Sequence, residues 1–279
     1  MKPDLHLHSA CSDGTDAPEE LARLAKEAGL DVIALTDHDT TSGVARCQST
    51  CEALGLRFLP GVEISAGGET EIHVLGYGIR ADDMEQALQS QRGSRDTRMV
   101  RIVHLLNEAG IPVTMDDVEQ AAAGAPLGRP HAALALVRLG YASSVKEAFA
   151  RWLGDGRPCC VRREKPSFAA AVDMIHQCGG AAVIAHPALL RTERRMLTQF
   201  LSEKLLCGAD GIEVWHSSHT PADCRELESF ARRSSLAVTG GSDYHGHVKS
   251  VRMGEGTDRW PDPEKDLQLL LSRIRPSML

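Results

Sequence analysis

Short apolar runs recur along this chain, and segments with helical spacing separate them. A run that leads through a helix into a second run predicts two parallel strands joined by a right-handed crossover. Strands that alternate with helices favour an α/β fold, and seven of them favour a barrel or distorted barrel over an open sheet, which stays the alternative. The runs expected to form strands are Pro3–Leu7, Asp31–Thr36, Arg57–Ile64, Glu71–Ile79, Ala181–Ala185, Gly211–Trp215 and Leu236–Thr239.

One long segment departs from this alternation. Residues 81–161 carry four stretches with helical periodicity and no convincing strand. This predicts a small helical subdomain inserted into the barrel, so that residues 1–80 and 162–279 form the barrel domain. The four expected helices are Arg98–Gly110, Met115–Ala123, Pro130–Leu139 and Ser144–Leu153.

Side chains that can bind a metal follow nearly every expected strand. His6 and His8 lie two residues apart, so they share one face of the first strand, and Asp13 follows in the next loop. Functional residues of a parallel barrel gather at the carboxyl ends of its strands, so we expect these side chains to form one site. The others at such positions are Asp37, His38, Glu63, His186, His216, Asp243 and His245.

Two further histidines need a separate argument. His73 begins its expected strand, but only a short turn separates that strand from the one that carries Glu63. An antiparallel hairpin would therefore place His73 beside Glu63. His131, in LGRPHAA at the beginning of a helix, could extend over the same end of the barrel. His104, His176 and His247 have no such context, and we expect them to be ordinary hydrogen-bonded histidines.

The chemistry of the candidate ligands indicates a catalytic metal centre. Imidazoles and carboxylates without clustered thiolates suit Zn, Mn or Fe in a catalytic role. At roughly four protein ligands per ion, the candidates are too many for one ion and imply two or three. Glu63 is the natural bridge between them.

Charge and cysteine content narrow the function classes. The net charge of −7 argues against a broad basic surface for nucleic acid, although a local cationic pocket stays possible. The eight cysteines form no pair of CxxC motifs, which favours reduced thiols in a cytoplasmic protein. We see no signal peptide and no apolar run of the roughly 20 residues that a bilayer requires, and we expect no membrane partner.

These motifs resemble those of the PHP family, the polymerase and histidinol phosphatase domains. The strings DLHLHSACSDG, ALTDHDT, GVEIS, GRPH, AHP and GSDYH occur in the family's order from residue 4 to residue 245. The helical insertion, with KEAFARWLG near its end, resembles the branch that acts on nucleotides, and the chain is similar to the nucleoside 3′,5′-bisphosphate phosphatases. The resemblance implies a distorted (β/α)₇ barrel and a centre of three metals.

The resemblance also implies a ligand set for each metal. One ion would be held by His6, His8, Glu63 and Asp243, and a second by Glu63, His73 and His131. A third would be held by Asp13, His38 and His245. His186 would approach the cluster as a ligand or a phosphate contact. We expect two or three divalent ions, with Mn²⁺ preferred and Zn²⁺ or Fe²⁺ as alternatives.

The chemistry that this site supports is hydrolysis of a phosphate ester. Clustered dications lower the pKa of a bound water, and the resulting hydroxide can attack phosphorus while the ions offset negative charge. Asp243, His186 and His216 are the catalytic candidates. Candidates for holding the substrate are Arg129, His186, His219 and Lys165; the basic run at Arg162, Arg163 and Lys165 could equally be a solvated linker. Trp215 and Tyr244 could stack on a base or simply pack.

The expected activity is therefore removal of the 3′-phosphate from nucleoside 3′,5′-bisphosphates such as pAp. A 5′-to-3′ exonuclease acting on short RNA with a 5′-phosphate is the near alternative, and a phosphatase of the histidinol phosphate type is another. A non-enzymatic alternative is a metal-stabilised accessory module that organises a partner protein. The expected partner is a small phosphorylated nucleotide, or a short RNA; the sequence does not indicate an oligomeric state.

Overall fold

The structure, a computed structural model, describes residues 1–67, 72–122, 127–161, 165–190 and 194–275. The chain forms two compact units: the barrel unit, Met1–Leu88 with Lys165–Leu279, and the helical unit, Gln89–Glu164. Helix α3, Ala81–Glu108, begins in the first and ends in the second. The predicted boundary at Ala81 is the beginning of this helix, and the helix expected from Arg98 is only its last part.

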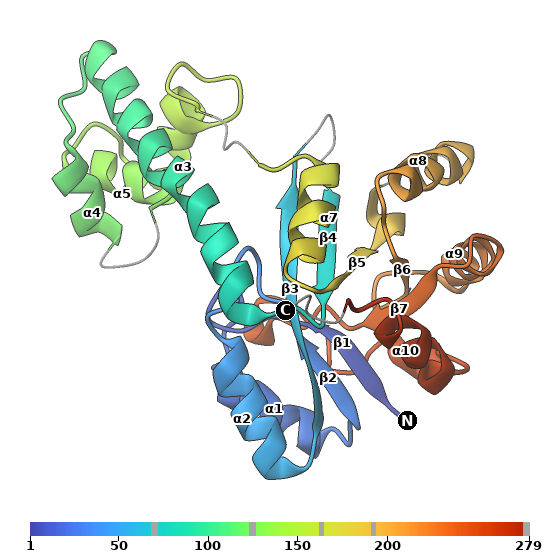
Figure 1. Cartoon of the computed structure of the whole chain (residues 1–279). Coiled ribbons are helices and arrows are strands. Elements are labelled where there is room, and N and C mark those ends of the chain that lie inside the picture. The colour runs from blue at the N-terminus through green and yellow to red at the C-terminus, as the bar shows by residue number, and fades with distance from the viewer. Residues whose placement is uncertain (68–71, 123–126, 162–164, 191–193, 276–279) are drawn as a thin grey trace. The chain divides into compact units, whose positions relative to one another are not determined.

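The barrel unit is built on one sheet of seven strands whose spatial order follows the chain (Figure 1). Neighbouring strands are parallel except where β4 pairs antiparallel with β3 and with β5. Beyond the last strand, the amide of Asp243 donates to the carbonyl of His6 (2.9 Å) and the amide of His8 donates to the carbonyl of Tyr244 (3.0 Å), which brings the two edges together. The predicted barrel is thus confirmed as a nearly closed, distorted one. Its strands are β1 (Pro3–Leu7), β2 (Val32–Leu35), β3 (Arg57–Ala66), β4 (Ile72–Tyr77), β5 (Ala181–Ile184), β6 (Gly211–His216) and β7 (Ala237–Gly241).

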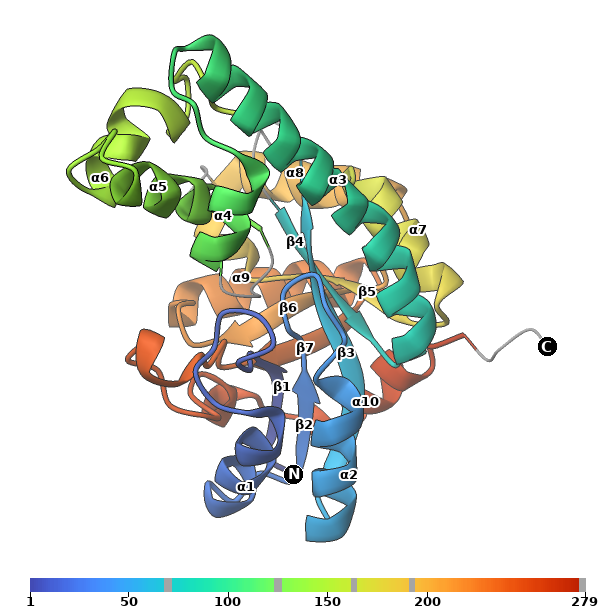
Figure 2. The same cartoon turned by 90° about the vertical axis from the view of Figure 1, so that its left-hand side faces the viewer.

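Helices surround this sheet, and α1 and α2 lie side by side next to β2 (Figures 1 and 2). Proline occupies the first turn of several of them, where its missing N–H costs no hydrogen bond. The helices of the barrel unit are α1 (Pro18–Glu27), α2 (Val44–Leu54), the first part of α3, α7 (Phe168–Gln177), α8 (Arg194–Leu206), α9 (Pro221–Arg233) and α10 (Pro263–Leu271). Short 3₁₀ turns lie at η2 (Pro187–Leu190), η3 (Gly246–Val248) and η4 (Thr257–Arg259).

Alternation along the strands separates the core from the site. In β1 every residue is buried. Leu5 and Leu7 belong to the apolar clusters that the sheet shares with its helices. Asp4 and His6 point to the opposite face and are also fully buried, inside the barrel. Burial on both faces of the sheet explains why the apolar runs of the sequence are short and continuous. The polar side chains that remain inside the barrel must then have hydrogen-bond or ionic partners.

The helical unit has an apolar core of its own. Met99, Ile102 and Leu106 of α3 are buried with Leu136 and Leu153. Its other elements are α4 (Met115–Ala122), α5 (Arg129–Arg138), α6 (Val145–Ala148) and the π-helical turn η1 (Phe149–Leu153). No strand occurs in its described residues, 89–122 and 127–161, as the sequence pattern predicts.

Gly241, at the end of β7, is where the barrel edges meet most tightly. A Cβ at this position would lie 2.2 Å from the Cβ of His6 and 2.5 Å from its backbone nitrogen. We therefore expect Gly241→Ala to lower the free energy of unfolding by about 1–3 kcal/mol, because backbone must shift to make room. Urea denaturation would measure this change. Gly55→Ala, where a Cβ meets nothing within 4 Å but the backbone φ is 61°, would serve as a control for conformational strain without close approach and should leave metal binding unchanged. A Gly241→Ala protein with unchanged stability would contradict the close approach of β1 and β7.

Candidate metal centre

Five histidine rings surround one carboxylate at one end of the barrel. Glu63 of β3 is only 1% exposed, and its oxygens lie 2.9–3.3 Å from a nitrogen of each ring. Neighbouring ring centroids are 4.6–5.8 Å apart in a closed circuit through His6, His8, His38, His73 and His186, which we call the histidine ring. A carboxylate with five imidazoles around it is well placed to bridge cations.

Strand ends and one hairpin explain this convergence. His6 lies near the end of β1 and His8 follows it directly, while His38 and His186 lie in the turns just after β2 and β5. The antiparallel pairing of β3 with β4 places His73 opposite Ser65, so that His73 Nδ1 lies 2.9 Å from Glu63 Oε1. The predicted hairpin is confirmed, and it brings the beginning of one strand to the end of the other.

Asp243 closes a second side of the site. Its backbone φ of 58° is in the left-handed region, which turns the side chain back towards the ring. Asp243 Oδ1 lies 3.3 Å from His8 Nε2 and 3.4 Å from His245 Nδ1. Asp243 Oδ2 lies 3.7 Å from His216 Nε2 and 2.6 Å from Lys249 Nζ. Sequence reasoning did not select Lys249, which is separated from the GSDYH motif by a short turn.

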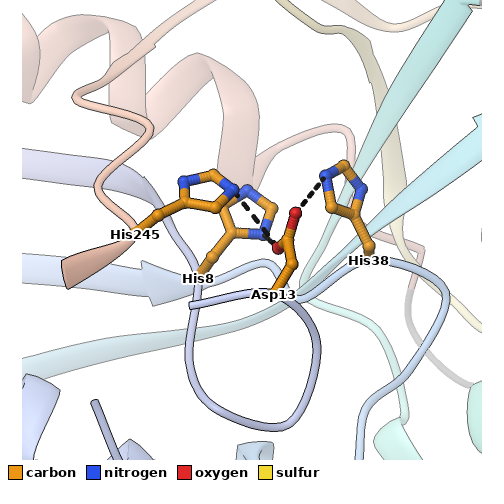
Figure 3. Close-up of side chains that lie close together, drawn as sticks. All are labelled: His8, Asp13, His38 and His245. Atoms are coloured by element: carbon orange, nitrogen blue, oxygen red, sulfur yellow. Dashed lines mark ion pairs between the residues drawn. The ribbon is translucent and has the colours of Figure 1, made fainter. Parts of the chain in front are cut away.

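Asp13 forms a third group with three of the histidines (Figure 3). Its oxygens lie 3.2 Å from His245 Nε2, 3.7 Å from His8 Nδ1 and 3.8 Å from His38 Nε2. The Asp13 side chain is 55% exposed, unlike the other carboxylates of the site. This group therefore opens to solvent.

Asp37 holds the loop that carries Asp13. It is 1% exposed, and its carboxylate accepts hydrogen bonds from the amide (2.7 Å) and hydroxyl (2.6 Å) of Ser9 and from the hydroxyl of Ser12 (2.6 Å). The sequence predicts a polar residue of the site at this position. In the structure Asp37 contacts the loop rather than the histidines, so that its role is to fix where Asp13 lies.

The electrostatics of the cluster follow from burial and from the opposite charges within it. Burial opposes protonation of His6, but Glu213, Glu63 and Asp243 outweigh this and hold the pKa of His6 well above its usual value. Burial likewise opposes ionisation of Glu63, yet His6 and His38 hold its pKa well below the usual range. Burial lowers the pKa of His38 to about 4. The site thus favours ionised carboxylates, beside which the His6 ring holds a proton and the His38 ring stays neutral.

Several imidazole nitrogens of this cluster are buried without any hydrogen bond. Such nitrogens indicate whether the site can hold cations. Among the described residues, they are His8 Nδ1, His8 Nε2, His38 Nδ1, His216 Nε2 and His219 Nε2. An unpaired buried nitrogen is costly unless something binds it. The nitrogens of His8 and His38 therefore fit divalent metal ions, for which imidazole and carboxylate are suitable donors.

In the part of the chain that the structure describes, four groups of side chains each have donor atoms within 4.8 Å of one another. The first is the group of Asp13 with His8, His38 and His245, and the second is His6, His8 and Asp243. The third is His38, Glu63 and His73, and the fourth is His6, Glu213 and His216. Glu63 belongs to the third group and also contacts His6 and His8 of the second, as expected of a bridge. The ligand set of each ion remains a prediction.

His216 and His219 lie beside the cluster in β6 and the turn that follows it. His216 is fully buried, and its Nδ1 accepts a hydrogen bond from the amide of Ser218 (3.0 Å). In a neutral ring the proton is therefore on Nε2, the atom that faces Asp243. His219 donates from Nδ1 to the carbonyl of Val214 (2.9 Å), and burial lowers its pKa to about 4.

Two predicted site residues belong to the helical unit. His131 Nδ1 accepts a hydrogen bond from the amide of Gly128 (3.1 Å) at the beginning of α5. Arg129 donates to Asp155 (2.9 Å) and to the carbonyl of Leu153 (3.2 Å). Within their own unit both side chains thus organise the beginning of α5, and their roles in metal and phosphate binding stay predictions.

The other residues predicted to contact substrate lie in different parts of the structure. Lys165 is in the barrel unit beside Gly67, just after β3, whereas Arg162 and Arg163 lie outside the described residues. Tyr244 donates its hydroxyl to Asp16 (3.0 Å). Trp215 is 7% exposed. The burial of Trp215 and the hydroxyl hydrogen bond of Tyr244 favour packing over base stacking.

Glu213 is a residue that sequence reasoning missed. It lies in β6 with no exposed surface, 2.9 Å from His6 Nδ1. A signal was present, because a carboxylate inside the otherwise apolar run GIEVW cannot be buried without partners.

Comparisons with known proteins agree with this geometry. The family described as the PHP domain matches residues 4–151. A 5′-3′ exoribonuclease of Haemophilus influenzae is 34% identical over 260 residues, which cover 92% of this chain and 94% of that protein. A 3′,5′-nucleoside bisphosphate phosphatase of Chromobacterium violaceum is 34% identical over 248 residues, 87% of this chain and 86% of that protein. A solved structure from Bifidobacterium adolescentis, named as a metal-dependent phosphoesterase, is 31% identical with a TM-score of 0.73, and covers 98% of this chain and 96% of that one.

Of the helices in the described residues, none combines the length and the apolar character that crossing a membrane requires.

Proposed function

The chain belongs to the PHP family of metal-dependent phosphoesterases, and from that premise we propose that it removes the 3′-phosphate from nucleoside 3′,5′-bisphosphates. The observation that carries the proposal is the histidine ring around Glu63, flanked by Asp243 and Asp13. Together these side chains offer enough donor atoms for more than one divalent cation. The Chromobacterium relative, a bisphosphate phosphatase by name, supports the choice of substrate.

We propose Mn²⁺ as the preferred ion, held by the groups around Glu63, Asp243 and Asp13, with Zn²⁺ or Fe²⁺ as alternatives. Ions bound there would polarise the phosphoryl group and make water a competent nucleophile near neutral pH. The free thiols of all eight cysteines are compatible with a cytoplasmic enzyme.

The chain's own residues have separate tasks in this proposal. His216 carries a proton on Nε2, facing Asp243 at 3.7 Å, and we assign to it protonation of the leaving 3′-oxygen. His186 has Nε2 3.1 Å from Glu63 Oε1 and a side chain 16% exposed, so it can meet both the cluster and a phosphoryl oxygen. Arg129, Lys165 and His219 are the proposed contacts for the rest of the substrate.

A substrate panel tests the proposal. We expect adenosine 3′,5′-bisphosphate to yield AMP and inorganic phosphate, with kcat/KM about 10- to 100-fold above that for adenosine 3′-monophosphate. One charge-assisted contact to the 5′-phosphate would account for this ratio. Phosphate release and chromatography of the nucleoside product measure both. Equal rates on the two substrates, or release of the 5′-phosphate, would contradict the assignment.

An exoribonuclease activity is the second candidate, because the Haemophilus relative, 94% covered, has that name. Short RNA with a 5′-phosphate belongs in the same panel, since hydrolysis on the 3′ side of a nucleotide uses the same chemistry on a diester. Preference for the oligonucleotide would favour this candidate. Turnover of histidinol phosphate alone would exclude both nucleotide assignments. If no ester were hydrolysed, and metal removal lowered only the melting temperature, an accessory module would be the better description.

A further inference from the structure

Glu213 is a buried carboxylate whose two oxygens serve two parts of the site. Oε1 lies 2.9 Å from His6 Nδ1, and Oε2 accepts a hydrogen bond from the backbone amide of His186 at 2.7 Å. The side chain has no exposed surface. A carboxylate so deeply buried is costly unless both oxygens are bonded, and here each has one short contact.

We propose that Glu213 is a positioning residue that sets the metal-binding edge of His6. An ionised Glu213 accepts the proton-bearing edge of the ring, so the proton of His6 is fixed on Nδ1. The lone pair on Nε2 is then free for a cation. That atom faces the cluster, at 3.2 Å from Glu63 Oε2 and 3.6 Å from Asp243 Oδ1.

The second oxygen of Glu213 acts on His186 through the backbone. His186 has a φ of 26°, a conformation that residues with a side chain rarely adopt. The hydrogen bond to its amide holds this turn directly after β5, and the His186 ring then stacks on His6 at a centroid distance of 5.8 Å and an angle of 19°. One side chain in β6 thus fixes two histidines that approach Glu63 from different strands.

Glu213→Gln tests the inference because glutamine keeps the shape but changes one acceptor oxygen into a donor. It can accept from only one of the two: with its oxygen on the amide of His186, its NH2 group faces His6 Nδ1 and favours the proton on Nε2, the atom that faces the cluster. We expect the tightest Mn²⁺ affinity to fall about 10- to 100-fold, the usual effect of losing a carboxylate behind a ligating histidine. The number of ions bound at saturation should stay unchanged. Titration with Mn²⁺, and the visible spectrum of the Co²⁺-loaded protein, would measure these quantities.

Asp210→Asn is a matched control in the same part of the chain. Asp210 Oδ2 lies 2.7 Å from His176 Nε2 and accepts from the amide of Ala182 at 2.8 Å, so it too joins a histidine and a backbone amide. It immediately precedes β6, whereas Glu213 lies within it. Both variants should lower the melting temperature of the metal-free protein, but only Glu213→Gln should weaken metal binding and alter the Co²⁺ spectrum.

Two results would overturn the inference. Metal affinity and Co²⁺ spectrum as in the wild type, with a lower melting temperature alone, would make Glu213 merely structural. Loss of one whole metal equivalent would make it a direct ligand, a reading that its grouping with His6 and His216 allows.

A measurement on the wild-type protein avoids any folding defect of the variant. Nitrogen NMR of the Zn²⁺-loaded protein should find His6 protonated on Nδ1 and bound to metal through Nε2, and the opposite arrangement would also overturn the inference. The inference rests on the metal centre of the proposed function but not on its substrate. Failure of the substrate panel and failure of these metal measurements are therefore separate outcomes.

Discussion

His8→Ala is expected to abolish hydrolysis of phosphate esters while leaving the barrel folded. His8 belongs to two of the four donor groups, and its ring lies 4.1 Å from that of His245 and 4.6 Å from that of His38, centroid to centroid. Both of its nitrogens are buried without a hydrogen bond, so the ring contributes little to the fold apart from packing. Loss of a direct ligand should exceed the effect of losing a residue behind one, and we expect kcat/KM to fall by more than about 100-fold.

Metal content and activity must be measured together in this experiment. His8→Ala should lose at least one metal equivalent by elemental analysis, with a circular dichroism spectrum like that of the wild type. Asp13→Asn affects only the solvent-open group and should lower the occupancy of that position alone. His104→Ala is the neutral control, because His104 is 70% exposed and contacts Glu108 on the same helix. Full activity and full metal content in either of the first two variants would require a different division of the ligands.

Removal of metal is expected to abolish activity completely and to lower the stability of the barrel. The cluster presents its donors together only in the folded chain, so ions bind the native state in preference to the unfolded one. Free metal at 100 times its dissociation constant should then add about 2.7 kcal/mol of unfolding free energy for each independent site. Melting temperatures measured over a range of Mn²⁺ concentrations, after exhaustive chelation, would test this.

Restoration experiments complete the metal test. Mn²⁺, Zn²⁺ and Fe²⁺ should each raise the melting temperature of the chelated protein, and Mn²⁺ should restore the highest activity. Mg²⁺ provides a control, because it prefers oxygen ligands to imidazole. A chelated protein that keeps its activity, or a melting temperature independent of added metal, would refute a metal centre built on Glu63.

Much of the site could be predicted because strand direction decides it. Each short apolar run has only one carboxyl end, and in a parallel barrel these ends meet. The positions of the apolar runs that precede His38 and His245 were therefore enough to place both residues at the site. His73 needed only the short turn that makes its strand antiparallel.

Other features depend on tertiary contacts that leave no periodic signal. Helix α3 continues from Ala81 to Glu108 without a break that would mark the change from one unit to the other. Asp37 and Glu213 are both acidic and buried, yet one fixes a loop and the other contacts two histidines. Only the position of the neighbouring strands separates these roles, so the spacing of residues could not.

The bonds that close the barrel have a consequence for synthesis of the chain. Asp4 accepts hydrogen bonds from the amide and hydroxyl of Ser242, 238 positions away, and just beyond, His6 and His8 contact Asp243 while the His8 ring stacks on His245. The first ligands leave the ribosome long before the last are made. A nascent chain that stops short of His245 therefore lacks ligands of the centre, and the complete centre can form only after the long loop between β1 and the residues that follow β7 has closed.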